Sequence, residues 1–134
     1  MRCFVDTNIL ISAGLFPNSV PAAALEKALV PPNTAILSDY SLDEMHRVIN
    51  RKFPHKAREL DLFLYRLLYT VERVPTPIAI HDAEAGIRDI NDRPLLRAAL
   101  NARADVFITG DKDFLESAVT DPKIVTATQF LKMT

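Results

Sequence analysis

The sequence predicts an α/β fold in which helices cover both faces of a parallel β-sheet. Short apolar segments typical of buried strands alternate with longer segments whose apolar residues recur at a helical period of roughly 3.6 positions. Strands that are separated by helices run parallel, and a parallel sheet is buried on both faces. Prolines punctuate these segments, and no internal repeat, low-complexity tract or linker divides them. We therefore expect residues 1–134 to form one domain.

In the first half of the chain, short apolar runs predict two strands, and apolar stripes predict the helices between and after them. The helix after the second strand carries Leu42, Met45 and Ile49 on one face, and the next helix carries Leu60, Leu64 and Leu67. The expected elements are a strand at Arg2–Asp6, helices at Ile9–Leu15 and Pro21–Val30, a strand at Ala35–Ser38, and helices at Ser41–Lys52 and His55–Tyr69.

The second half continues the alternation with shorter elements. A proline at the start of an apolar repeat predicts the beginning of the long helix in this half. The expected elements are a strand at Thr70–Val74, a helix at Pro94–Arg103, a strand at Asp105–Thr109, a short helix near Asp113–Ser117, a weak strand at Lys123–Val125 and a last helical turn at Ala127–Lys132.

The composition excludes several classes of protein. Apolar residues make up 49% and charged residues 25%, which argues against disorder, and the formal net charge is −1. A polyanionic substrate would therefore need a local basic patch and bound cations. Cys3 is the single cysteine, so no internal disulfide or cysteine zinc site is possible. With no signal peptide and no membrane-spanning apolar run, we expect a cytoplasmic protein without a membrane partner.

Four acidic residues from distant segments are expected to meet at one edge of the sheet. Asp6 ends the first strand and Asp111 follows the fourth, at the carboxyl edge where ligands of open α/β sheets bind. Helices that return antiparallel to the strands begin at the same edge. Glu44 lies near the start of one such helix, and Asp92 lies just before another. This convergence makes the four residues the candidate catalytic and metal-binding site.

Each acid also has a structural interpretation. Asp92 and Asp111 precede helices and would both be good N-caps. Glu44 could be solvated on the polar flank of its helix, although it lies nearer the apolar stripe than Asp43 does. Asp6 has the weakest structural interpretation, because an acid that ends a buried central strand is costly without a partner.

Neighbouring carboxylates repel one another, so some must be protonated or a cation must neutralise them. Oxygen ligands suit Mg²⁺ or Mn²⁺ rather than zinc. Such ions can activate water and stabilise charge on a phosphodiester, which requires neither a histidine base nor a nucleophilic serine. The three histidines have no triad or ligand spacing and are interpreted as surface or helix-end residues: His46, His55 and His81.

Four segments together resemble the PIN-domain nucleases. They are Phe4–Leu10 (FVDTNIL), an acid within Ser41–Met45 (SLDEM), Arg88–Leu95 (RDINDRPL) and Ile108–Leu115 (ITGDKDFL). Their order and spacing agree nearly end to end, and they are more specific together than singly. Within that family the sequence looks most like the prokaryotic toxin components of toxin–antitoxin pairs, relatives of the VapC-type toxins.

The resemblance implies a three-layer α/β/α fold with five parallel strands in the order 3-2-1-4-5. It also implies endonucleolytic cleavage of RNA with Mg²⁺ or Mn²⁺. Asp6 would be the central metal ligand, with Asp92 and Asp111 completing the coordination. Glu44 would hold a second ion or position the attacking water.

Further residues and partners follow from the same resemblance. Asn8, Ser12 and Thr109 would supply supporting hydrogen bonds, and Asp113 is a candidate fifth acid. Family members commonly form homodimers, and toxins of this type are usually silenced by a small antitoxin protein.

One position departs from the family pattern. Arg93 stands where many relatives carry another acid, which leaves the binding of two ions open; it could contact a substrate phosphate or be a solvated charge. The densest basic stretch, with Arg47, Arg51 and Lys52, begins beside Glu44. It could follow an RNA backbone or be a solvated junction between two helices.

Apolar residues near this stretch also have two interpretations. Tyr40 and Phe53 could stack on bases or belong to the core. The apolar stripe of the His55–Tyr69 helix suits core burial or a groove for a second subunit or an antitoxin, and core burial is the plainer interpretation.

Two other classes of function remain as alternatives. The fold could be a catalytically weak or inactive RNA- or protein-binding module. A phosphatase of the haloacid dehalogenase type needs a second acid two residues after Asp6, where Asn8 stands, and the acid and lysine pattern of response-regulator receivers is not evident. With three glycines in the chain, no glycine-rich phosphate loop is present.

Overall fold

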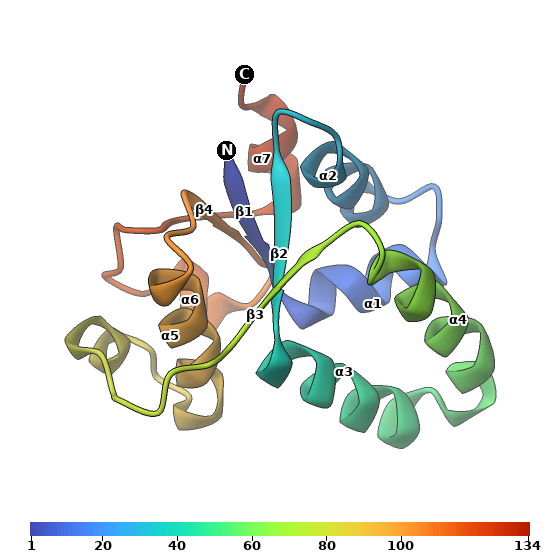
Figure 1. Ribbon diagram of the computed structural model, residues 1–134, viewed down its shortest axis with the longest axis horizontal. Coiled ribbons are helices and arrows are strands. Elements are labelled where there is room, and N and C mark those ends of the chain that lie inside the picture. The colour runs from blue at the N-terminus through green and yellow to red at the C-terminus, as the bar shows by residue number, and fades with distance from the viewer.

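The computed structural model, which covers residues 1–134, is a three-layer α/β/α arrangement around a five-stranded parallel sheet (Figure 1). The strand order is 3-2-1-4-5, so the fold that the sequence resemblance implies is confirmed. The first and fourth strands are neighbours at the centre of the sheet. From β1 the chain continues to β2 on one side, whereas from β4 it continues to β5 on the other side. This reversal of strand order leaves a crevice at the carboxyl ends of β1 and β4.

The predicted elements are all present, with shifts at their ends. The strands are β1 (Arg2–Val5), β2 (Thr34–Ser38), β3 (Glu72–Val74), β4 (Val106–Ile108) and β5 (Lys123–Val125). The α-helices are α1 (Thr7–Leu15), α2 (Val20–Leu29), α3 (Asp39–Lys52), α4 (Ala57–Leu67), α5 (Arg93–Asn101), α6 (Lys112–Leu115) and α7 (Ala127–Lys132). Three short 3-10 turns are η1 (Pro54–Lys56), η2 (Asp82–Gly86) and η3 (Ile90–Asp92).

The central strands send alternate side chains into two separate cores, as the period of two in a strand requires. Cys3 and Val5 of β1 belong to the larger core, which packs against α1, α2, α3, α4 and α7. Phe4 belongs to the smaller core under α5 and α6. There the Phe4 ring stacks on Phe107 with 5.2 Å between centroids, and Phe107 contacts Phe114 at 4.5 Å. Figure 1 shows α5 and α6 on the opposite side of the sheet from α1 and α4.

Local hydrogen bonds explain the shifted ends of two elements. Helix α3 begins two residues earlier than predicted, because the Ser38 hydroxyl accepts a hydrogen bond from Ser41 N at 3.0 Å and caps the helix. The predicted strand Thr70–Val74 is shorter, because Thr70 N and its hydroxyl both donate to the Leu67 carbonyl at 2.9 Å. These bonds extend the turn after α4 and delay the start of β3.

Two predicted helices are also shorter than expected. The segment His55–Tyr69 divides into the η1 turn and helix α4, which ends at Leu67. Helix α5 ends at Asn101 instead of Arg103, where a φ of 56° places the backbone in the left-handed region. His81 caps η2, and the other two histidines are exposed, so the interpretation of the histidines as surface or helix-end residues is confirmed.

Helix α4 has two apolar faces. The predicted stripe with Leu60, Leu64 and Leu67 is buried in the larger core, which confirms the plainer interpretation. The outer face exposes Tyr65, whose ring packs edge to face on that of Tyr69 in the turn after the helix, with 5.6 Å between centroids. No single helix has the length and hydropathy of a membrane span, and α1 and α2, bent by 111°, reach them only as a pair.

Cys3 lies in the middle of this packing. Its side chain is fully buried on β1, and burial is the main cause that raises the pKa of its thiol to about 11. The single cysteine is therefore a core residue.

Candidate functional site

Asp6 lies where β1 passes directly into α1, and its carboxylate is held from both sides. As the N-cap of α1, its Oδ1 accepts a hydrogen bond from Thr7 N at 2.8 Å. Its Oδ2 accepts a hydrogen bond from the Thr109 hydroxyl at 2.7 Å. The Asp6 backbone N–H donates to the Ile108 carbonyl at 3.0 Å and extends the pairing of β1 with β4. The carboxylate is thus fixed at the carboxyl edge of the sheet.

Burial dominates the electrostatics of Asp6. The residue is 4% exposed, and loss of hydration raises the pKa of its carboxyl to about 7. The negative charges of Glu44 and Asp111 raise this pKa further, whereas the hydrogen bonds from Thr109 and Thr7 oppose the increase. Without a cation, Asp6 is therefore partly protonated at neutral pH.

Asp111 reaches the same edge from β4, three residues after Ile108, the last paired residue of the strand. It is the N-cap of α6, and its Oδ1 accepts a hydrogen bond from Asp113 N at 2.9 Å, so its capping interpretation is confirmed. Asp111 N donates to Thr109 Oγ1 at 2.9 Å. Asn8 adds a longer link, because its Oδ1 accepts from Gly110 N at 3.4 Å. The β4–α6 turn is therefore bound to the β1–α1 turn.

Glu44 comes from α3, whose capped start lies at the carboxyl end of β2. Its side chain is half-buried and lines the cavity beside Asp6. Its neighbour Asp43 is exposed and lines a different hollow, near β3. The structure thus places Glu44 at the acidic edge and Asp43 away from it, as the position of the apolar stripe on this helix predicts.

Asp92 ends the η3 turn and occupies the N-cap position of α5, but its side chain makes no capping hydrogen bond. The interpretation of Asp92 as a helix cap is therefore wrong. Partial burial is the main cause that raises the pKa of Asp92 to about 7, followed by the charge of Asp111, then those of Asp89, Asp6 and Glu44. The carboxylate is held close to four other acids without a hydrogen bond that neutralises it.

These side chains surround one open cavity of about 410 Å³. Its polar wall carries the four predicted acids, and its other wall is partly apolar. The cavity is lined by Asp6, Thr7, Asn8, Ile11, Ser12, Glu44, Val48, Lys52, Phe53, Asp92 and Asp111. Residues separated by as many as 105 positions in the sequence (Asp6 to Asp111) therefore meet as the topology predicts.

A second acidic group adjoins this cavity. Asp89, Asp92 and Asp113 each place one carboxylate oxygen within 4.8 Å of the others. Asp113 also forms an ion pair with Arg88, with 3.0 Å between Oδ1 and Nε. Sequence reasoning did not select Asp89 as a site residue. Its spacing of three from Asp92, in a short turn before a helix, was the available signal.

The predicted basic residues have different environments. Lys52 lines the acidic cavity, Arg51 is exposed, and the Arg47 guanidinium lies 5.6 Å from the centroid of the Tyr40 ring. Arg93 is half-buried and its Nε donates to the Ile87 carbonyl at 2.9 Å. One N–H of the Arg93 guanidinium is therefore used to hold the segment before α5.

The two aromatic candidates also differ. Phe53 is half-buried and lines the cavity, so its ring borders the site. The Tyr40 hydroxyl donates to the Asn91 carbonyl at 2.5 Å, and Arg47 lies over the Tyr40 ring. Tyr40 therefore connects α3 to the turn before α5.

The donor set of the cavity fits a divalent cation that prefers oxygen. Carboxylates with raised pKa values, such as Asp6 and Asp92, carry an electrostatic strain that a cation would relieve. Thr7, which lines the same cavity, has the one buried side-chain oxygen without a hydrogen-bond partner. No histidine or cysteine lines the cavity, which disfavours zinc.

The fold and this edge define the class of the protein: an α/β domain in which carboxylates gather where a parallel sheet reverses its strand order. Within that class the chain belongs to the PIN domain family, because the family model of the PIN domain matches residues 2–113. The match includes all four predicted acids. The family resemblance stated from the sequence is thereby confirmed.

Three solved structures show that this fold also occurs in other proteins of low sequence identity. VapBC2 from Rickettsia felis, bound to a DNA fragment from its promoter, has a TM-score of 0.71 and 17% identity over 94% of this chain and 98% of that chain. VapC20 from Mycobacterium tuberculosis, a sarcin-ricin loop cleaving toxin, has a TM-score of 0.60 and 16% identity over 89% of this chain and 97% of that chain. VapBC-1 from nontypeable Haemophilus influenzae has a TM-score of 0.60 and 19% identity over 96% of this chain and 99% of that chain. A comparison with curated proteins finds no match.

Proposed function

We propose that the protein is an endoribonuclease that hydrolyses RNA phosphodiester bonds with Mg²⁺ or Mn²⁺ and acts as the toxin of a type II toxin–antitoxin pair. The observation that carries the proposal is the gathering of Asp6, Glu44, Asp92 and Asp111 around one open cavity in a PIN domain. The nature of VapC20, a toxin that cleaves the sarcin-ricin loop, supports RNA as the substrate.

In this proposal the four acids have different roles. Asp6, Asp92 and Asp111 would hold the ion, and Glu44 would hold a second ion or orient the attacking water. When bound, the ion makes water more acidic and neutralises charge on the phosphodiester. Thr109 keeps Asp6 and Asp111 in register through its two hydrogen bonds.

The remaining lining residues of the cavity serve the substrate. Asn8 and Ser12 offer polar side chains beside the acids. Lys52, the last residue of α3, faces the same cavity and supplies positive charge for a backbone phosphate, and Arg51 and Arg47 precede it on the same helix. Phe53 presents an aromatic ring on which a base can stack. The protein as a whole carries a net charge of −1, so this local charge must provide much of the RNA affinity.

The partners in the proposal are a small antitoxin protein and a second copy of the chain, in the cytoplasm. Two of the similar structures are VapBC assemblies, which supports an antitoxin. Tyr65 of α4 is 60% exposed and Tyr69, in the turn after this helix, is 77% exposed, and this pair of rings is suited to a protein contact.

An RNA cleavage assay in Mn²⁺, Mg²⁺ or excess EDTA tests the activity. We expect cleavage only with a divalent ion, its loss in Asp6→Asn, and a loss of about 100-fold or more in Glu44→Gln. Asp43→Asn is the matched control, because this acid is adjacent in sequence but lies outside the cavity. Cleavage in excess EDTA, or full activity of Asp6→Asn, would contradict the proposal.

Titration calorimetry with Mn²⁺ separates the enzyme from the alternative, a binding module that has lost catalysis. An active site should bind Mn²⁺ with a stoichiometry that Asp6→Asn reduces. If the protein binds RNA but takes up no Mn²⁺ at millimolar concentration, the binding module becomes the better description.

A further inference from the structure

The carboxylate of Asp92 has no hydrogen bond that orients it, in contrast to the carboxylates of Asp6 and Asp111. Its position must therefore come from the backbone of the segment that precedes it. That segment, residues 75–92, contains no strand and no α-helix, only the 3-10 turns η2 and η3. Something outside regular secondary structure must fix the path of this segment.

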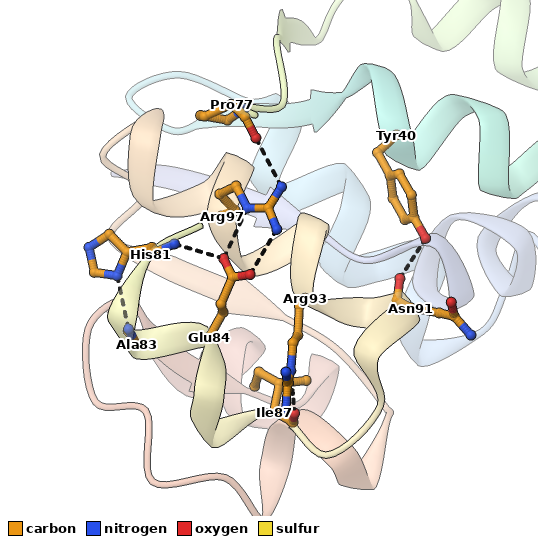
Figure 2. A network of polar contacts seen from close by, with 9 residues as sticks. All are labelled: Tyr40, Pro77, His81, Ala83, Glu84, Ile87, Asn91, Arg93 and Arg97. Atoms are coloured by element: carbon orange, nitrogen blue, oxygen red, sulfur yellow. Dashed lines mark hydrogen bonds and ion pairs between the residues drawn. The ribbon is translucent and has the colours of Figure 1, made fainter. Parts of the chain in front are cut away.

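A buried ion pair provides the first fixed point. Arg97 of α5 forms two parallel hydrogen bonds with Glu84 of η2, Nη2 to Oε1 at 2.7 Å and Nε to Oε2 at 2.9 Å. The side chains of Glu84 and Arg97 are 4% and 15% exposed. Such paired geometry fixes orientation as well as distance. Figure 2 shows this pair at the centre of a network between α5 and the segment.

The remaining hydrogen bonds of the pair go to the main chain of the same segment. Arg97 Nη1 donates to the Pro77 carbonyl at 3.0 Å, and Glu84 Oε2 accepts from His81 N at 3.1 Å. A pair that served only to neutralise charge would need no such contacts. A buried ion pair adds little net stability compared with apolar residues of similar size, so its backbone contacts are the more informative feature.

Two single hydrogen bonds continue the network towards Asp92. Arg93 Nε donates to the carbonyl of the buried Ile87 at 2.9 Å, and the Tyr40 hydroxyl donates to the Asn91 carbonyl, one residue before Asp92. Both contacts are drawn in Figure 2. From Pro77 to Asn91 the segment is thus held at successive points by side chains of α3 and α5.

We propose that Glu84 and Arg97 are positioning residues that hold the backbone of residues 75–92 so that Asp92 faces Asp6 and Asp111. The inference rests on the proposed function, because it assigns the pair a role at the same site. Neither residue lines the acidic cavity, so their effect passes through the backbone. The segment also carries Asp89, which would be displaced together with Asp92.

The test compares two bidentate arginine–glutamate pairs. Arg97→Met removes the pair with Glu84, and Arg2→Met removes the pair between Arg2 and Glu72 at the opposite edge of the sheet. We expect Arg97→Met to weaken Mn²⁺ binding about 10–100-fold in calorimetry, as loss of a supporting contact does at metal sites. Arg2→Met should leave Mn²⁺ affinity unchanged, even if it lowers the melting temperature as much as Arg97→Met does.

Hydrogen exchange on the metal-free variants gives a second readout that does not depend on activity. Amides of residues 81–92 should exchange faster in Arg97→Met than in the unmutated protein and in Arg2→Met. Glu84→Gln keeps the shape of the side chain and part of the hydrogen bonding, so it should fold and show a smaller effect in the same direction.

The outcomes separate the two proposals. If the unmutated protein binds Mn²⁺ and the folded Arg97→Met and Glu84→Gln variants bind it equally well, the positioning role is overturned while the proposed function stands. Unchanged exchange of residues 81–92 in both variants also overturns it. If the unmutated protein binds no Mn²⁺, the proposed function fails and the inference fails with it.

Discussion

The hydroxyl of Thr109 donates a 2.7 Å hydrogen bond to Oδ2 of Asp6, although the two residues are 103 positions apart in the sequence. The same hydroxyl oxygen accepts a hydrogen bond from Asp111 N at 2.9 Å. One side chain, directly after β4, therefore orients the carboxylate of Asp6 and the backbone of Asp111. The Thr109 hydroxyl thus links the Asp6 carboxylate to the start of the turn between β4 and α6.

Replacing this hydroxyl by a methyl group of similar size should impair the site without opening a cavity. In Thr109→Val we expect a loss of roughly 10–100-fold in Mn²⁺ affinity and in kcat/KM for RNA. The pKa of Asp6 should rise further, because the hydrogen bond from Thr109 opposes the increase caused by burial. Thr109→Ser, which retains the hydroxyl, is the control, and equal activity of both variants would argue against this role.

Asp6→Asn should stabilise the metal-free protein at alkaline pH. The folded-state pKa of Asp6 is about 7, above its ordinary value of 3.8, so the native state binds more protons than the unfolded state between these values. The stability that the protonated form confers is therefore lost as pH rises through about 7. We expect Asp6→Asn to melt about 3–6 °C higher at pH 8 in EDTA, and the difference should shrink as pH falls below 7 and be smallest near pH 4, close to the unfolded-state pKa.

With Mn²⁺ present at pH 8, the unmutated protein should melt higher than Asp6→Asn. Mn²⁺ should raise the melting temperature of the unmutated protein at pH 8 and have little effect on Asp6→Asn, because binding to the native state stabilises it. If Asp6→Asn melts lower in EDTA at pH 8, the carboxylate is not under electrostatic strain, which would contradict this prediction.

Glu84 predicts the opposite pH dependence. Its hydrogen bonds with Arg97 hold the pKa of Glu84 below its ordinary value. The stability that it contributes is present above the unfolded-state pKa near 4.5 and is lost as pH falls through the lower folded-state value. Between about pH 5 and 3, the unmutated protein should lose roughly 3–6 °C more than Glu84→Gln does. Calorimetric melting at several pH values in EDTA measures this difference.

Lys52→Ala should weaken RNA binding without affecting the ion. Lys52 lines the acidic cavity, so its loss should lower RNA affinity about 3–10-fold and reduce the salt dependence of binding by about one phosphate contact. Lys56, exposed in the η1 turn, supplies the control Lys56→Ala. Equal effects of both variants on RNA affinity would remove Lys52 from the site, whatever the effect on Mn²⁺.

Sequence patterns predicted the elements that long-range packing reinforces. The apolar runs that contain Phe4, Ile36 and Phe107 allow only buried strands, and their alternation with amphipathic helices fixes a parallel sheet. Once the strands are parallel, Asp6 and Asp111 must lie at one edge. The ends of elements were less predictable, because single hydrogen bonds such as Thr70 to Leu67 decide them.

The structure of the segment before α5 could not be predicted from the sequence. Residues 75–92 have no hydrophobic period, since buried polar contacts hold them in place of an apolar face. Glu84 could not be distinguished from a surface acid, because its partner Arg97 lies 13 positions away in another element. Asp92 appeared to be a good helix cap, and only the structure shows that its carboxylate makes no such bond.

The burial of Cys3 also makes the chain a convenient host for spectroscopic labels. Its thiol is fully buried with a pKa of about 11, so it should resist maleimide in the folded state. Ile78 is 96% exposed within residues 75–92. A cysteine introduced at that position would be the one reactive thiol on the folded surface, and a fluorophore or spin label attached there would report movement of the segment that leads to Asp92.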